Sequence, residues 1–224
     1  MYLIFDTETA DAPPKNKIRN AAPKNDWSIW PRLVQLGFII YDKYRNPIKV
    51  YDKIMKPNGL FKIEPGAQNV HGISIEMAEE KGIPPEEIIK DFYDALNDVK
   101  YVICHNIDFD NNVMLAEHFK NKIKIKPNNN ERIKICTMKQ ATNYCKIIPD
   151  EHWKTEYKWP SLEELHKKLF GYTFEDAHNA IIDVKATAQC FWELIDRNVI
   201  FLNDDNVLRK EFVETHPDSD TINY

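Results

Sequence analysis

The sequence predicts an α/β domain built on a mixed sheet, an antiparallel meander followed by parallel strands, with helices flanking it. Short apolar runs separated by polar turns dominate the first 56 residues, which is typical of strands. From residue 84 onward, apolar residues recur at helical spacing on either side of one buried run. Strands that are followed by alternating helix and strand favour a mixed sheet covered by helices. The chain of 224 residues is long enough for one substantial core.

Three strands are expected first. Tyr2–Phe5 is a short apolar strand, and Leu33–Tyr41 is a longer one. Ile48–Lys56 alternates between apolar and polar residues, so we expect it to pair with the second strand across the turn Asp42–Pro47. The polar segment Ala12–Trp30 is irregular, and a loop of that length is uncommon in a compact domain unless it has a function.

Helices follow in the second half of the chain. Pro84-Pro85-Glu86 opens a helix with one apolar stripe, and Lys100–Cys104 reads as a buried strand after it. Another helix is expected to begin near Asp110. Ser161 and Glu164 form a capping box at the start of the next one. The last helix carries apolar residues at alternating spacings of three and four, namely Ile181, Val184, Ala188, Phe191 and Ile195.

The charge balance and the cysteines narrow the possible functions. The chain has 35 acidic and 30 basic residues, a net charge of −5 that argues against a protein that coats nucleic acid. No apolar run approaches the ~20 residues of a membrane span, and no basic leader precedes the first strand. The four cysteines show no metal-like spacing, so we expect reduced thiols and a cytoplasmic location. Residues 1–200 form the expected domain, and 201–224 form an acidic C-terminal tail.

Two carboxylates stand out near the N-terminus. Asp6 and Glu8 are two residues apart, and on a strand such residues share one face about 6.5–7 Å apart. Paired carboxylate oxygens suit a hard cation such as Mg²⁺ or Mn²⁺. The pair taken alone is also compatible with a solvated strand edge.

Two further groups of polar residues lie at helix starts. Asp110 falls in a first helical turn just after a buried strand, where α/β sheets place ligand sites; the alternative is an N-terminal charge favoured by the helix dipole, or Asp108 as an N-cap. His178 and Asp183 would lie about 140° apart on a regular helix. They can converge only if His178 belongs to the loop before the helix, and a structural loop histidine is the alternative.

The combination of these motifs is more specific than any one of them. Asp6-Thr7-Glu8, then His105-Asn106-Ile107-Asp108-Phe109-Asp110, then His178 with Asp183 follow one another along the chain. In this order they resemble the DEDDh subgroup of DnaQ-like 3′→5′ exonucleases, including the epsilon-type exonuclease domain of bacterial DNA polymerase III. The resemblance covers roughly residues 1–200 and extends to Val70-His71-Gly72-Ile73, similar to a family loop between the meander and the first helices. It implies an RNase H-like fold with a mixed five-stranded sheet.

The resemblance also implies a metal centre. Asp6, Glu8 and Asp183 would bind the metal ion that carries the attacking water, and Asp6 would also hold a second ion. Asp110 would complete the second site directly or through water. His178 would be the general base, because a histidine near neutral pH can take a proton from a polarised water. Two ions about 3.5–4 Å apart would stabilise charge on both the entering and the leaving oxygen.

By the same resemblance, substrate contacts fall on four other residues. Thr7, His71 and Phe109 are expected to touch the terminal nucleotides, and Asn106 to help shape the pocket. The predicted function is a 3′→5′ exonuclease that uses two Mg²⁺ or Mn²⁺ ions and releases nucleoside 5′-monophosphates. Its expected substrate is single-stranded DNA or a frayed 3′ end, with DNA favoured over RNA.

Alternatives remain open at this point. An RNA-trimming exoribonuclease can use the same fold, because preference for deoxyribose depends on how the pocket treats a 2′-OH. A non-catalytic nucleic-acid-binding module would not need the complete set of carboxylates and His178. Proofreading in partnership with a DNA polymerase catalytic subunit, or DNA repair, would each use such an activity; no membrane partner is expected.

Basic residues and tryptophans suggest a path for a single strand. Seven basic residues and one acid lie between residues 120 and 139, and Trp27 and Trp30 lie in the irregular N-terminal segment. Phosphate contacts and base stacking are one interpretation, and a solvated surface with core-anchoring aromatics is the other. The basic residues are Lys120, Lys122, Lys124, Lys126, Arg132, Lys134 and Lys139.

Overall fold

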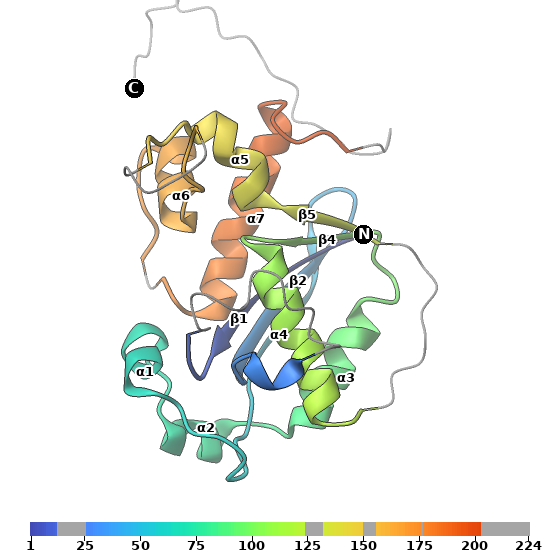
Figure 1. Cartoon of the computed structure of the whole chain (residues 1–224). Coiled ribbons are helices and arrows are strands. Elements are labelled where there is room, and N and C mark those ends of the chain that lie inside the picture. The colour runs from blue at the N-terminus through green and yellow to red at the C-terminus, as the bar shows by residue number, and fades with distance from the viewer. Residues whose placement is uncertain (13–25, 124–131, 150–155, 176, 203–224) are drawn as a thin grey trace, which may run out of the picture.

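A mixed sheet forms the centre of the protein. The computed structural model describes residues 1–12, 26–123, 132–149, 156–175 and 177–202. The sheet has five strands in the order β3-β2-β1-β4-β5, which confirms the predicted fold class (Figure 1). Neighbours β1–β2 and β2–β3 are antiparallel, whereas β1–β4 and β4–β5 are parallel. The strands are β1 (Tyr2–Thr9), β2 (Leu33–Tyr41), β3 (Pro47–Ile54), β4 (Tyr101–Cys104) and β5 (Ile133–Cys136).

Helices cover both faces of this sheet. One core joins the sheet to α3 and α4, and the other joins it to α5, α6 and α7. A smaller cluster lies under α1 and α2, beyond the end of β1 where Figure 1 shows these two helices. The helices are α1 (Pro65–His71), α2 (Ile75–Lys81), α3 (Pro85–Ala95), α4 (Ile107–Lys120), α5 (Thr137–Cys145), α6 (Leu162–Phe170) and α7 (Ala180–Asp196), with a 3₁₀ turn η1 (Trp27–Ile29) before β2.

Alternation along β1 distributes its side chains between the two cores. Leu3 and Phe5 pack into the core on the α4 side, and Ile4 packs into the core on the α7 side. Because side chains alternate with a period of two, Asp6 shares the face of Ile4, and Thr7 shares the face of Phe5. The polar end of β1 therefore presents different residues to α4 and to α7.

Helix α7 lies unusually close to β2 at its first turn. A Cβ added to Gly37 would stand 2.7–2.9 Å from backbone atoms of Ala180 and Ile181, closer than real Cβ atoms approach. Gln35, two residues earlier, accepts a hydrogen bond from the Ala180 N–H at 3.3 Å and donates to Asp52 at 2.7 Å. Glycine and glutamine on one strand thus fix the start of α7 on the sheet.

The other end of α7 is tied to the same hairpin. Arg45, in the turn between β2 and β3, forms a bidentate ion pair with Asp196, with N–O distances of 2.6 and 2.7 Å. Its guanidinium also lies over the Trp192 ring, 5.1 Å from the centroid. Both ends of α7 are therefore held by β2 and the turn that follows it.

Several element boundaries differ from the sequence prediction. Strand β1 continues to Thr9, four residues beyond the apolar run, because its polar end keeps pairing with β2. Helix α4 begins at Ile107, which places Asp110 in its first turn as predicted, but its N-cap is Asn106, so the Asp108 N-cap interpretation was wrong. Val70 and His71 end helix α1 and do not form a loop, with Gly72 as the left-handed C-cap.

Other predictions agree with the structure. Leu33–Tyr41 is a strand with the predicted bounds, and the Ser161 capping box is formed, with Ser161 Oγ accepting from the Glu164 N–H at 3.1 Å. All four cysteines are buried and outside any disulfide. Within the described ranges, no helix is long and apolar enough to cross a membrane. The predicted tail lies almost wholly outside the described residues.

Candidate active site

Three carboxylates meet where β1 passes the start of α7. Oxygen atoms of Asp6, Glu8 and Asp183 all lie within 4.8 Å of one another, and we call these residues the α7 group. The strand supplies Asp6 and Glu8 on its α7 face, and the docking of α7 at Gly37 brings Asp183 to them. The predicted convergence of these three residues is therefore found in the structure.

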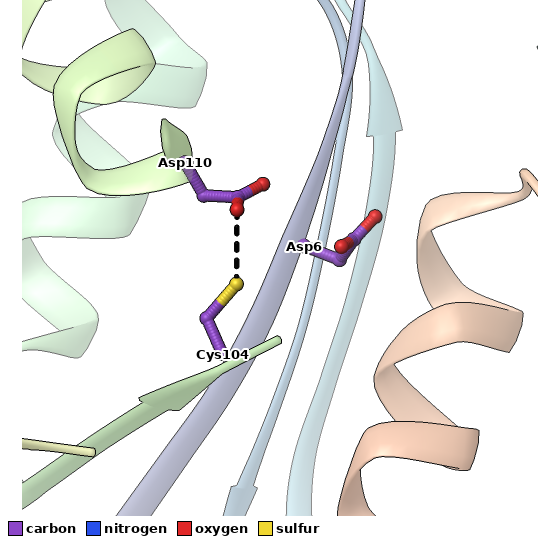
Figure 2. A group of neighbouring side chains, drawn as sticks. All are labelled: Asp6, Cys104 and Asp110. Atoms are coloured by element: carbon purple, nitrogen blue, oxygen red, sulfur yellow. Dashed lines mark hydrogen bonds between the residues drawn. The ribbon is translucent and has the colours of Figure 1, made fainter. Parts of the chain in front are cut away.

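A second group lies on the α4 side of the same aspartate. Ligand atoms of Asp6, Cys104 and Asp110 also fall within 4.8 Å of one another, and we call these residues the α4 group. Figure 2 shows Asp110 reaching from α4 toward Cys104 at the end of β4, with Asp6 on β1 beside them. Asp6 is common to both groups, so it lies between Asp110 and Asp183.

Hydrogen bonds hold the Asp110 carboxylate on both of its oxygens. Oδ1 accepts from the Thr7 backbone N–H at 3.0 Å and from the Thr7 hydroxyl at 2.7 Å. Oδ2 accepts from the Cys104 thiol at 3.1 Å. Sequence reasoning treated Cys104 only as a buried thiol, and its position at the end of a buried strand next to the second motif was the signal that could have marked it.

The electrostatics of the two groups show uncompensated negative charge. Burial, then repulsion by Asp183 and Asp110, raises the pKa of Glu8 to about 8. Burial and the neighbouring carboxylates likewise hold the pKa of Asp6 well above its usual range. Burial raises the pKa of Asp110 and of Asp183 to about 6, against the opposing effect of the hydrogen bonds that each accepts. Burial and the adjacent carboxylates also raise the pKa of the Cys104 thiol.

His178 lies on the loop before α7, as the spacing demanded. Its backbone has a positive φ of 69°, and its N–H donates to Asp183 Oδ2 at 3.0 Å. The backbone of His178 thus orients the carboxylate, while its exposed side chain remains available at the rim of the α7 group. Because His178 lies in the loop and Asp183 lies in the first turn of α7, the two residues meet although they are five positions apart in the sequence.

Of the four predicted substrate residues, Thr7 contacts the site directly and His71 lies near its histidine. Thr7 holds Asp110 by two hydrogen bonds. The His71 ring lies close to His178 and to the Thr9 carbonyl; burial is the main cause that lowers its pKa, and the Ile73 N–H donates to its Nδ1 at 3.0 Å.

The other two predicted substrate residues flank the first turn of α4. Asn106 adopts the left-handed conformation with φ of 73° and makes no side-chain capping bond to the helix. Phe109 is half-buried, and its ring centroid lies 6.1 Å from that of Trp30. Whether the four residues contact a nucleotide stays a prediction.

His105, beside Asn106, links the end of β4 to two other segments. Its Nδ1 lies 3.0 Å from Thr137 Oγ1, and its Nε2 lies 3.0 Å from the Pro160 carbonyl oxygen. Burial lowers the pKa of His105 to about 4. The neutral ring therefore braces the loop from which Asn106 and α4 start.

Most of the predicted basic surface is used within the protein or lies outside the described residues. Lys120 donates to the Trp30 and Pro31 carbonyls at 2.7 and 3.1 Å, and Arg132 donates to the Leu96 carbonyl at 2.7 Å. Of the other five, Lys139 pairs with Asp108, and Lys124 and Lys126 lie outside the described residues. Lys122 and Lys134 are exposed.

The two tryptophans of the N-terminal segment differ in burial. Trp30 is buried in the core, as the core-anchor interpretation expected, whereas Trp27 is 43% exposed. The core anchor is thus confirmed for one of the two tryptophans.

The donor set of the two groups fits divalent cations. Four buried or half-buried carboxylates supply hard oxygen ligands, and their raised pKa values show that the site lacks positive charge of its own. A cation in each group would relieve this repulsion, and Asp6 would contribute to both. The arrangement therefore suits hydrolysis of a phosphodiester, in which negative charge builds on two oxygens.

An α/β domain with two acidic groups that share one aspartate on the central strand has the features of a metal-dependent nuclease. The model of the exonuclease family RNase_T matches residues 3–191, and the chain belongs to this family. It is a DnaQ-like exonuclease with the RNase H-like fold.

Solved structures of exonuclease I share this fold. A complex of E. coli exonuclease I with a dT13 oligonucleotide has a TM-score of 0.65 and 20% identity, and the match covers 87% of this chain. The zinc-bound form of the E. coli enzyme with single-stranded DNA also has a TM-score of 0.65 and 20% identity, with 88% of this chain covered. The chain spans 40% of the length of both structures. No curated protein sequence matches the chain.

Proposed function

We propose that the protein is a 3′→5′ exonuclease that removes nucleoside 5′-monophosphates from single-stranded DNA or a frayed 3′ end. The observation that carries this proposal is the sharing of Asp6 between the α4 group and the α7 group. Two adjacent cation sites joined by one carboxylate are what a two-metal hydrolysis of a phosphodiester requires. DNA is the favoured substrate because the exonuclease I structures with this fold contain DNA oligonucleotides.

Each acidic residue has a role in this proposal. Asp6, Glu8 and Asp183 would hold one divalent cation, Mg²⁺ or Mn²⁺, and Asp6 with Asp110 would hold the other. Bound cations supply positive charge that polarises the attacking water and stabilises the phosphodiester oxygens. His178, on the solvent side of the α7 group, takes the proton from the attacking water. The water oxygen bonds to phosphorus as the bond from phosphorus to the 3′-oxygen of the preceding nucleotide breaks, and solvent water supplies the proton that this oxygen takes up.

Residues around the first turn of α4 would place the 3′ end. Thr7 and Asn106 lie beside Asp110, and Phe109 presents a half-buried ring next to it. His71 borders the same space from α1, close to His178. In the proposal these four residues contact the terminal nucleotides, and an aromatic ring such as Phe109 would stack on a base.

Digestion of end-labelled oligonucleotides tests the function. Matched DNA and RNA strands, single-stranded and duplex, are incubated with Mg²⁺, Mn²⁺ or EDTA, with the label at the 5′ end in one set and at the 3′ end in another. We expect 5′-labelled single-stranded DNA to shorten stepwise and 3′-labelled DNA to release a labelled mononucleotide at once, only with a metal ion.

The outcomes separate the alternatives. If RNA is digested faster than DNA, RNA would be the substrate and the proposed mechanism would still hold. Release of labelled mononucleotide from the 5′ end would overturn the direction, and digestion in EDTA would overturn the metal mechanism. A DNA polymerase catalytic subunit as partner stays a prediction, which copurification from native extract would test.

A further inference from the structure

We propose that Cys104 is a positioning residue that fixes the Asp110 carboxylate so that a single lone pair of Oδ2 faces the cation of the α4 group. This inference rests on the proposed function, because it concerns how one of the two cation sites is shaped. It assigns a role to a residue that contributes no ligand of its own to the hard cation.

The three donors around Asp110 come from two strands. Thr7 on β1 donates twice to Oδ1, and Cys104 at the end of β4 donates once to Oδ2, at 3.1 Å. Asp110 is 3% exposed and Cys104 is fully buried, so water cannot replace the thiol as a donor. Protein groups therefore donate hydrogen bonds to both oxygens of the Asp110 carboxylate.

Counting lone pairs shows what remains for a cation. A carboxylate has about four lone-pair positions, two on each oxygen. Thr7 occupies both positions on Oδ1, and the Cys104 thiol occupies one on Oδ2. Counting these contacts from Thr7 and Cys104, one position on Oδ2 is left, which favours monodentate binding by Asp110. Without the thiol, Oδ2 would have two open positions and the carboxylate could turn about its Cβ–Cγ bond.

The thiol has a second acceptor within reach. Cys104 Sγ lies 3.6 Å from the His105 carbonyl oxygen, compared with 3.1 Å from Asp110 Oδ2. A thiol has one proton, and a carboxylate is a stronger acceptor than a neutral carbonyl. The shorter distance and the charge both direct the proton to Asp110. Figure 2 shows the two side chains pointing at one another.

Binding of Mn²⁺ to the full chain tests this role without any nuclease assay. Isothermal titration and the electron paramagnetic resonance signal of free Mn²⁺ are measured for the wild type, Cys104→Ser and Cys104→Val. Serine keeps a donor at the position, and valine keeps a similar volume without one. Because outer partners of metal ligands typically contribute about 10–100-fold in affinity, we expect Cys104→Val to weaken one of two Mn²⁺ ions by roughly 10-fold or more. Cys104→Ser should restore most of the loss.

Cys136→Val is the matched control. Cys136 lies opposite Cys104 in the β4–β5 register and is also buried, but it is not part of the α4 group. The Cys136→Val variant should bind both Mn²⁺ ions with the affinity of the wild type. Thermal unfolding in EDTA is recorded for every variant, and Cys104→Ala replaces Cys104→Val if the latter does not fold.

The inference fails if the donorless variant binds both ions with wild-type affinity. It also fails if Cys104→Ser is as weak as Cys104→Val, or if both ions weaken equally together with the melting temperature, because these results would indicate a packing role. A wild-type protein that binds no Mn²⁺ at all would instead overturn the proposed function.

Discussion

The two acidic groups share Asp6 but are assembled in different ways. In the α4 group, Asp110 is held by three hydrogen bonds from Thr7 and Cys104, all on neighbouring strands. In the α7 group, Asp183 is oriented by one backbone N–H, and its place depends on how α7 docks at Gly37. One group is fixed by side-chain contacts and the other by the packing of a whole helix.

This difference indicates where the site tolerates change. A carboxylate gripped by several donors keeps its orientation whether or not a cation is bound, because each donor favours the ionised form. Glu8, with its pKa raised to about 8 by burial and two carboxylates, instead depends on a cation for compensation. We therefore expect the α4 group to be preformed and the α7 group to be the one that a cation stabilises most.

The largest effect should come from removing the residue that both groups share. Asp6→Asn takes a charged ligand from both sites, and the loss of cation-based charge stabilisation should lower kcat by about 10⁴-fold or more. Asp108→Asn is the matched control, because Asp108 is exposed on the first turn of α4 and pairs with Lys139 away from the groups. Activity of Asp6→Asn within 10-fold of the wild type, in a single-strand digestion assay, would contradict the shared site.

A change at His178 should affect chemistry and leave cation binding intact. Its backbone, not its ring, orients Asp183, so His178→Asn removes the base while keeping the N–H donor. Asparagine also tolerates the positive φ of 69° at this position. We expect kcat to fall about 10³-fold with unchanged Mn²⁺ affinity. A parallel loss of Mn²⁺ binding in the titration would show that the ring, too, supports the metal site.

Gly37→Ala should break the α7 group from a distance. The new methyl group would press on the Ala180 backbone and move the start of α7, at a cost of about 1–3 kcal/mol in stability. A displacement of about 1 Å in Asp183 should lower activity about 10²-fold and weaken one Mn²⁺ ion, because the α4 group does not depend on α7. Gly66→Ala, where nothing lies within 4 Å, should behave as wild type. Equal weakening of both ions would contradict the independence of the two groups.

The smallest effect concerns pH and the metal-free protein. Ordinary carboxyl groups lose their protons near pH 4, whereas burial raises the pKa of Asp110 and Asp183 to about 6 and that of Glu8 to about 8. Between about pH 4 and pH 8 the folded state therefore binds more protons than the unfolded state. Its stability should fall as pH rises through this window, by several degrees in melting temperature measured in EDTA.

Two variants sharpen this profile. Glu8→Gln should flatten the dependence of the melting temperature on pH above about pH 6, and Asp110→Asn should flatten it below that pH. The reason is that the raised pKa is about 8 for Glu8 and about 6 for Asp110. Saturating Mn²⁺ should reduce the fall in melting temperature with rising pH, because the cation binds ionised carboxylates. A wild-type melting temperature that rises with pH in EDTA would contradict the raised pKa values.

The sequence predicted those parts of the site that depend on local pattern. Asp6 and Glu8 share a face because of strand alternation, and His178 reaches Asp183 because the loop ends just before α7. The β2 strand was predicted with its observed bounds because every one of its residues is apolar or small except Gln35. These features could be predicted because they depend only on residues that are close together in the sequence.

Other features depend on contacts between distant segments. Strand β1 extends through Thr9 because β2 continues to supply hydrogen-bonding partners for its polar end, which an apolar run does not reveal. The closeness of Gly37 to Ala180 and the contact of Cys104 with Asp110 require the sheet and both helices to be in place. Likewise, Lys120 reads as a surface charge in the sequence, but its carbonyl partners become visible only in the fold.

The ties at both ends of α7 have a consequence for synthesis. Gly37 and Gln35 hold its start, and Arg45 holds Asp196 near its end, so the last described helix closes on strands made at the beginning of the chain. Contacts between such distant residues form late, because the intervening chain must first be brought together. A ribosome-bound chain that still lacks α7 carries Asp6 and Glu8 without Asp183. In the proposed mechanism, a nascent chain could not cut nucleic acid until α7 has emerged and docked.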